Sequence, residues 1–210
     1  MYQVIPGILE KEWSEIVKKI ELVKPLTQTI HIDLLDGKFA GNTTFMDPTP
    51  FKKYSSEIFF ELHMMVDEPI QYVDSFAACG FKRFLGHIEK MSDQQEFVEK
   101  VSQIGEVGLA VDGETSLSKI KVPAIDLDCL LIMTIKAGFS GQEFSKDFAQ
   151  KIDTYRLQDN LLPLEVDGGI NDKTIFDALA FGATRFVSTS YLFENPKENY
   201  ENLCKIAANV

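Results

Sequence analysis

The sequence is poor in cysteine and in basic residues, and it contains no long hydrophobic run. Its three cysteines, Cys79, Cys129 and Cys204, are far apart among 210 residues and follow no metal-ligand spacing, which argues against a disulfide scaffold or a cysteine-based zinc module. We therefore expect reduced thiols and a cytoplasmic protein. No apolar stretch approaches the roughly 20 residues of a membrane span. The first residues lack the basic and apolar regions of a signal peptide, so we expect none.

The charge balance is strongly acidic. Lysine and arginine together number 21 against 32 aspartates and glutamates, which gives a net charge of −11. Such a chain is a poor partner for nucleic acid or for an anionic membrane surface. It also repels a phosphorylated ligand at long range. Any phosphate site must therefore be local and built from backbone N–H groups and helix N-termini.

Short apolar runs alternate with longer amphipathic segments along the whole chain. Most of the runs are nearly continuous in apolar residues, as is typical of strands buried on both faces of a parallel sheet. The predicted strands are residues 3–8, 29–34, 58–64, 83–88, 106–111, 129–134, 163–166 and 185–188. The predicted helices are residues 12–23, a segment from Pro69 to just before Gly80, and residues 93–104, 145–156, 172–181 and 196–208.

Strands that alternate with helices predict a parallel α/β architecture. Eight even units fill residues 1–210 with no linker between them, which favours a single-domain (β/α)8 TIM barrel of the ribulose-phosphate binding type. An open, doubly wound sheet is the alternative. The helical pattern is weakest after Val111, where only a turn or two is expected near residues 116–120.

Four polar residues interrupt the predicted strands at their carboxyl ends. His31 and Asp33 are two residues apart and so point to the same face of one strand, while His63 and Asp167 end two others. Each alone is compatible with a hydrogen-bonded core residue or a helix cap. Together they predict a site for one divalent ion such as Zn²⁺, Fe²⁺ or Mn²⁺. We do not expect His87 to be a ligand.

Glycines and hydroxyl residues follow the last three predicted strands. Barrels often hold a phosphate on these loops, where glycine lets backbone N–H groups approach the phosphate oxygens. The pattern predicts a phosphate site formed by Gly138, Phe139, Ser140, Gly141, Gly168, Gly169, Thr189 and Ser190.

Several segments, in order along the chain, resemble the ribulose-phosphate 3-epimerase family. Residues 5–9 (IPGIL) are similar to the opening A-P-S-I-L, and residues 31–39 (HIDLLDGKF) to H-x-D-x-M-D-G-x-F. Residues 62–66 (LHMMV) are similar to the H-L-M-V segment. Residues 133–144 (MTIKAGFSGQEF) and 165–169 (EVDGG) are similar to M-S/T-V-x-P-G-F-G-G-Q-x-F and E-V-D-G-G. Motifs of this length in this order are specific for the superfamily.

The resemblance implies an isomerase that binds a phosphosugar and one divalent metal ion. It implies that Asp33 and Asp167 are both metal ligands and the two acid/base groups, and that Met65 and Met133 line the substrate pocket. The implied reaction, in the pentose phosphate pathway, is the 3-epimerisation of D-ribulose 5-phosphate to D-xylulose 5-phosphate through an enediolate. We also expect a homo-oligomer.

Four positions depart from the family pattern. Gly7 replaces a serine that touches the substrate, Leu35 replaces a pocket methionine, and Thr189 replaces the glycine of S-G-S. Residues 137–141 (AGFSG) replace P-G-F-G-G. Because these changes fall in the substrate shell, a 3-epimerase of a 6-phosphohexulose such as allulose 6-phosphate is an alternative, and so is a catalytically weak sugar-phosphate binding protein. A metal-free decarboxylase or aldolase lacks support, because no D-x-K-x-x-D run is present.

Overall fold

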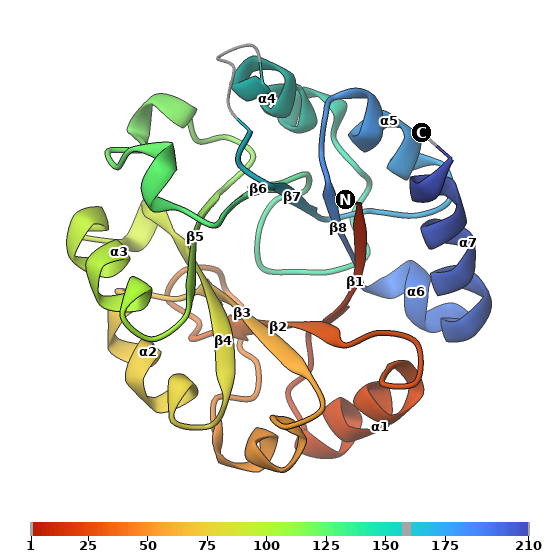
Figure 1. Ribbon diagram of the computed structural model, residues 1–210, viewed down its shortest axis with the longest axis horizontal. Helices are drawn as coiled ribbons and strands as arrows, with labels where there is room; N and C mark the ends of the chain where they lie inside the picture. Colours follow the sequence, from red (N-terminus) through yellow and green to blue (C-terminus); the bar gives the residue numbers. More distant parts are fainter. Residues whose placement is uncertain (1, 157–160, 210) are drawn as a thin grey trace.

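Eight parallel strands close into a barrel in chain order, with β8 paired to β1, in a computed structural model that describes residues 2–156 and 161–209 (Figure 1). This confirms the predicted (β/α)8 fold. The strands are β1 (Gln3–Ile8), β2 (Thr29–Leu35), β3 (Phe59–Met65), β4 (Phe81–His87), β5 (Glu106–Val111), β6 (Cys129–Met133), β7 (Leu164–Asp167) and β8 (Arg185–Ser188).

Helices surround the barrel as an outer ring (Figure 1). The α-helices are α1 (Trp13–Val23), α2 (Ile70–Ala77), α3 (Gln94–Ser102), α4 (Lys146–Arg156), α5 (Thr174–Ala180), α6 (Ser190–Glu194) and α7 (Pro196–Ala208). Short 3₁₀ turns are η1 (Thr49–Tyr54), η2 (Ile88–Lys90), η3 (Leu117–Lys119) and η4 (Ala124–Asp126). In the described part of the chain, no helix is long and apolar enough to cross a membrane.

The strand bounds agree with the sequence patterns to within two residues, and the short turn expected near residues 116–120 is present as η3. Only 3₁₀ turns follow β2 and β5, so two of the eight units lack an α-helix. The short α6 was not predicted, because five residues are too few to show a helical period.

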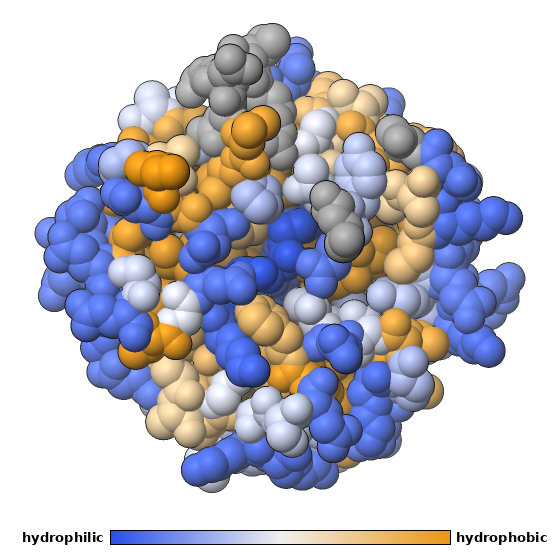
Figure 2. Space-filling model, viewed as in Figure 1, coloured by the Kyte–Doolittle hydropathy of each residue, from blue (hydrophilic) through white to orange (hydrophobic). Residues whose placement is uncertain are grey.

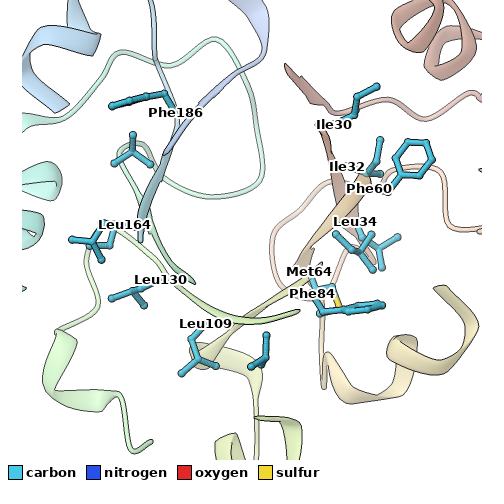
Figure 3. Close-up of a cluster of buried hydrophobic side chains, with 14 of the residues drawn as sticks. Ile30, Ile32, Leu34, Phe60, Met64, Phe84, Leu109, Leu130, Leu164 and Phe186 are labelled. Carbon is cyan, nitrogen blue, oxygen red and sulfur yellow. The ribbon is translucent and has the colours of Figure 1, made fainter. Parts of the chain in front are cut away.

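Alternation along each strand separates an outer apolar layer from the barrel interior. On β2, Ile30, Ile32 and Leu34 are buried and point away from the barrel axis, where the helices cover them (Figure 3). Phe60 and Phe186 do the same from β3 and β8 (Figure 3). Burying each such side chain contributes about 1.5–3 kcal/mol, so this layer anchors the strands whose other face carries the polar residues.

The barrel interior is unusually polar in its lower layer. Glu61 and Glu165, both completely buried, share the guanidinium of Arg185, with N–O distances of 2.6 Å to each. Arg83 adds a second cation to Glu61 at 2.6 Å. Figure 2 shows hydrophilic residues around the outer helices and also at the centre of the face, over the strands. A charged layer of this kind is stable only when its members are paired, and here they are.

Candidate active site at the carboxyl ends of the strands

The barrel brings together the four residues that the sequence singled out as ligands. His31 and Asp33 lie on β2, and Asp33 stands in register with His63 on the neighbouring β3. Asp167 ends β7. All four side chains are buried, and one ligand atom from each lies within 4.8 Å of the others. Burial of two carboxylates so close together requires a positive charge between them.

The distances show how the group is arranged. Nδ1 of His63 lies 2.9 Å from Oδ1 of Asp33 and 3.3 Å from Oδ2 of Asp167. Nε2 of His31 faces the same two carboxylates at 3.3 Å and 3.9 Å. Each histidine therefore directs one ring nitrogen into the space between the two aspartates.

The second nitrogen of His31 is held by the charged layer below. Its Nδ1 lies 2.8 Å from Oε1 of Glu61, in hydrogen-bonding contact. Burial raises the pKa of Glu61, but the Arg185 charge, the bond to His31 and Arg83 outweigh it and hold the pKa well below its ordinary value. An ionised Glu61 accepts a hydrogen bond from Nδ1–H, and in the neutral ring this leaves the lone pair on Nε2.

The second nitrogen of His63 leads into another chain of contacts. His63 Nε2 lies 2.9 Å from Nε2 of His87, whose Nδ1 lies 2.9 Å from Oε2 of Glu89. The other oxygen of Glu89 accepts a hydrogen bond from the backbone of Asp112. Burial raises the pKa of Glu89, but the bonds from His87 and Asp112 outweigh it and lower this pKa to about 2. His87 thus lies behind His63 and outside the four-residue group.

Electrostatics at the centre of the group demand positive charge. Burial disfavours a charged His31, yet the nearby carboxylates of Asp33, Glu165 and Glu61 raise its pKa well above the ordinary value. Nε2 of His31 nevertheless has no hydrogen-bond partner among the described residues. Two imidazole nitrogens and two carboxylates that face one point match the ligand types of a divalent transition metal. A cation there would replace the protons that the carboxylates otherwise attract.

Above this group lies a pocket that contains every residue predicted to contact the substrate. Its walls include Asp33 and Asp167 beside Met65, Met133, Gly138, Phe139, Ser140, Gly141, Gly168, Gly169, Thr189 and Ser190. No lysine or arginine is among the described lining residues. An anion in this pocket would therefore depend on backbone N–H groups.

Gly168, directly after β7, must be a glycine because of its backbone conformation and its close surroundings. Gly168 has a φ of +119°, and a Cβ there would lie 2.3 Å from the side chain of Ile135. Thr134 holds the same turn by donating its hydroxyl to the carbonyls of Asp167 and Gly168 at 3.0 Å and 2.5 Å. The carboxylate of Asp167 and the loop after it are thus placed as one rigid unit.

Asp36 shapes the turn that contains Gly37. Oδ1 accepts hydrogen bonds from the backbone of Lys38 and Phe39. Oδ2 accepts one from the backbone of Asp67. The side chain therefore also joins the loop after β2 to the loop after β3.

Sequence reasoning missed Glu61, Glu165, Arg185 and Glu89 as supports of this site. A signal was present for two of them, because Glu61 precedes His63 by two residues and Glu165 precedes Asp167 by two. Residues two apart on a strand share a face, so both glutamates had to point inward. No local pattern linked Arg185 or Glu89 to the histidines.

Comparisons with known proteins point to one family. A family model described as the ribulose-phosphate 3 epimerase family matches residues 3–193. Proteins named ribulose-phosphate 3-epimerase are similar to this chain. The one from Schizosaccharomyces pombe is 29% identical over 205 residues, which cover 93% of this chain and 90% of that protein. The one from Chlamydia pneumoniae is 33% identical over 175 residues, which cover 79% and 76%.

Solved structures show the same fold at low identity. A 3-keto-L-gulonate-6-phosphate decarboxylase from Vibrio cholerae has a TM-score of 0.74 at 10% identity and covers 100% of this chain and 99% of its own. A 3-hexulose-6-phosphate synthase from Salmonella typhimurium has a TM-score of 0.70 at 11% identity, with 99% of both chains covered. At this low identity, these likenesses show the shared fold alone. The family, in contrast, is matched by sequence over residues 3–193. The chain belongs to the ribulose-phosphate 3 epimerase family.

Proposed function

We propose that this chain is a metal-dependent 3-epimerase that interconverts D-ribulose 5-phosphate and D-xylulose 5-phosphate. The observation that carries the proposal is the meeting of Asp33 and Asp167 with His31 and His63 at the floor of a glycine-walled pocket. A phosphate-binding module alone would not need two buried carboxylates beside two buried histidines. Membership of the epimerase family supports the same reaction.

The residues present fit a divalent cation. His31 through Nε2, His63 through Nδ1, and the carboxylates of Asp33 and Asp167 would hold it, since one ligand atom from each lies within 4.8 Å of the others and Nε2 of His31 has no hydrogen-bond partner among the described residues. The mixed nitrogen and oxygen donors suit Zn²⁺, Fe²⁺ or Mn²⁺. When bound, such an ion supplies Lewis-acid stabilisation of negative charge on the substrate oxygens next to the reacting carbon.

The two aspartates provide the proton transfers. Epimerisation at C3 requires removal of a proton on one face of the carbon and delivery of a proton on the other. Asp33 comes from β2 and Asp167 from β7, so their carboxylates enter the pocket from different strands across the barrel mouth. Burial raises the pKa of Asp33, but its bonds with His31 and His63 outweigh this and hold the pKa below its ordinary value. Asp33 transfers the proton on one face of C3 and Asp167 the proton on the other, and the two carboxyl groups exchange their acid and base roles when the reaction runs in reverse.

The loops after β6, β7 and β8 orient the substrate. Gly168 and Gly169 follow Asp167 directly, so a phosphate held by their backbone N–H groups has a set position relative to that carboxylate. Gly138 to Gly141 and residues 189 and 190 complete the proposed phosphate site. Because no cationic side chain is among the described lining residues, backbone N–H groups must supply the attraction.

The decisive experiment gives the metal-loaded protein D-ribulose 5-phosphate in D₂O. We expect D-xylulose 5-phosphate to form, with deuterium at C3 of substrate and product. A parallel reaction with allulose 6-phosphate tests the hexulose alternative, and the better substrate is the one with the higher kcat/KM. If neither sugar acquires deuterium at C3, the protein is not a 3-epimerase of these substrates and the binding-protein alternative takes its place.

A further inference from the structure

Gly7 and Thr189 lie against each other at the mouth of the barrel. Gly7 lies near the end of β1 and stands in register with His31. Thr189 follows β8, whose Ser188 pairs with Pro6. A Cβ on Gly7 would lie 2.4 Å from Oγ1 of Thr189 and 2.8 Å from Cγ1 of Val187. These separations are far below ordinary contact, so the Thr189 hydroxyl occupies the place of a side chain at position 7.

Packing, and not backbone conformation, keeps residue 7 a glycine. Gly7 is not among the glycines with positive φ, so its backbone is open to any residue type. A small side chain could therefore stand at the end of β1 if β8 did not fill the space. The two positions are complementary. Gly7 on β1 contributes no side chain here, and Thr189, directly after β8, contributes a hydroxyl.

The Thr189 hydroxyl is in a position to bind a ligand. Thr189 is half-buried and lines the same pocket as Asp33 and Asp167. Ser188, one residue earlier, donates its hydroxyl to the carbonyl of Ile170 and is thus occupied. None of the hydrogen bonds found among the described residues involves Oγ1 of Thr189, in contrast to the bonded hydroxyls of Thr44 and Thr134.

The side chains of the pocket leave few groups for the hydroxyls of a sugar. Apart from the two carboxylates, its polar side chains are the hydroxyls of Ser140, Thr189 and Ser190. Both serines are exposed, whereas Thr189 is partly buried beside the strand that pairs with β2. A hydroxyl in a partly desolvated place discriminates among ligands more strongly than an exposed one, because water replaces it less well.

We propose that the Thr189 hydroxyl positions the substrate by hydrogen bonding to a hydroxyl group of the sugar chain, and that Gly7 is small in order to leave it room. The inference rests on the proposed function, since it assumes a phosphosugar in this pocket. Thr189 is a positioning and specificity residue and takes no part in proton transfer.

The first test removes the hydroxyl and keeps the shape. Thr189→Val should lower kcat/KM for the better phosphosugar about tenfold, the scale of one lost hydrogen bond. Most of the loss should lie in KM, with metal content unchanged. Thr189→Ser should recover most of it. The matched control is Thr184→Val just before β8, where the hydroxyl is 3.4 Å from the carbonyl of Leu164 and outside the pocket; this change should leave kcat/KM unaltered.

The second test exploits the contact with Gly7. Gly7→Ala should reduce kcat/KM as much as Thr189→Val does, because the added methyl group displaces the hydroxyl. In a Thr189→Gly, Val187→Ala background, which removes both close contacts of the added methyl group, the same change should cost little more. Losses that simply multiply would overturn the proposal, and so would a Thr189→Val variant with wild-type kinetics.

Binding separates this inference from the proposed function. Calorimetric titration of D-ribulose 5-phosphate into wild type and Thr189→Val measures the contact through the Kd for the equilibrated sugar phosphate instead of through the rate. If wild type binds but does not epimerise, the proposed function fails, while an approximately tenfold weaker Kd for Thr189→Val still supports the contact. If wild type epimerises and both proteins bind equally, this inference alone is wrong.

Discussion

Asp33 and Asp167 carry different local contacts although both face the same point. Asp33 lies 2.9 Å from His63 and 3.3 Å from His31, whereas Asp167 lies 3.3 Å and 3.9 Å from the same two rings and is fixed by its rigid loop. Asp33→Asn and Asp167→Asn should each lower kcat by at least about 100-fold, the usual effect of losing a positioned acid or base. Steady-state rates with metal content measured on the same samples test this.

Asp147→Asn, an exposed position on α4, is the matched control for the loss of a carboxylate. Asp167→Asn should still allow deuterium exchange at C3 while inversion fails, because Asp33 can remove and return a proton on its own face. Either aspartate variant keeping more than about a third of the wild-type kcat would contradict the assigned roles.

Glu89 helps to determine which ring nitrogens of His87 and His63 carry protons. Its two oxygens accept from His87 and from the backbone of Asp112, and a glutamine can satisfy only one of these donors. Glu89→Gln should therefore loosen His87 and, through it, His63. We expect divalent-metal affinity to fall about tenfold, the lower end for loss of a group that supports a ligand. Competition with a chelator measures it; exposed Glu96→Gln on α3 is the control, and equal affinities would refute the coupling.

At the scale of elements, α4 supports the loop after β5, which contains no α-helix. Nζ of Lys151 donates to the carbonyls of Asp112, Gly113 and Thr115, at 3.0 Å and 2.6 Å for the first and last. One ammonium thus satisfies three backbone acceptors of a loop that has only 3₁₀ turns of its own. The same loop meets Glu89 through the backbone of Asp112, so α4 supports the site indirectly.

Lys151→Met should destabilise the fold by about 2 kcal/mol, because a charged hydrogen-bond donor to buried acceptors is lost. For a domain of this size that corresponds to roughly 4–8 °C in Tm, measurable by thermal unfolding. The control on the same helix is Lys146→Met, whose pairing with Asp177 is exposed and worth well under about 1 kcal/mol. Equal Tm shifts in the two variants would show that the three carbonyls do not depend on Lys151.

For the whole molecule, the net charge of −11 opposes the approach of an anionic substrate. Raising the ionic strength from about 0.01 to 0.15 M shortens the Debye length from roughly 30 to 8 Å and screens this repulsion. We expect kcat/KM to rise about two- to threefold over this range, with metal saturation held constant. Initial rates in KCl measure it. A fall instead would mean that a cationic side chain, such as exposed Lys136, closes on the phosphate.

Much of this architecture follows from the order of residues along the chain. Strands buried on both faces need continuous apolar runs, whereas the helices between them need apolar residues at a helical period. The alternation of strands and helices that defines the barrel can therefore be predicted from local sequence. The period of two on a strand places His31 with Asp33 on the inner face. Since parallel strands all end at the same rim, the polar residues that close β2, β3 and β7 had to meet there. The glycine loops after β6 and β7 and the hydroxyl residues after β8 are readable for the same reason.

Tertiary structure alone decided which groups support the site. The side chains of Gln3 and Arg185 lie 182 positions apart in the chain and are joined by a hydrogen bond only because β8 closes against β1. The same closure brings Thr189 against Gly7, and the register of β2 with β3 places Asp33 opposite His63. Closure and register depend on the packing of all eight strands together. No local period encodes them, and for that reason residues 7 and 189 look like two unrelated changes until the barrel is formed.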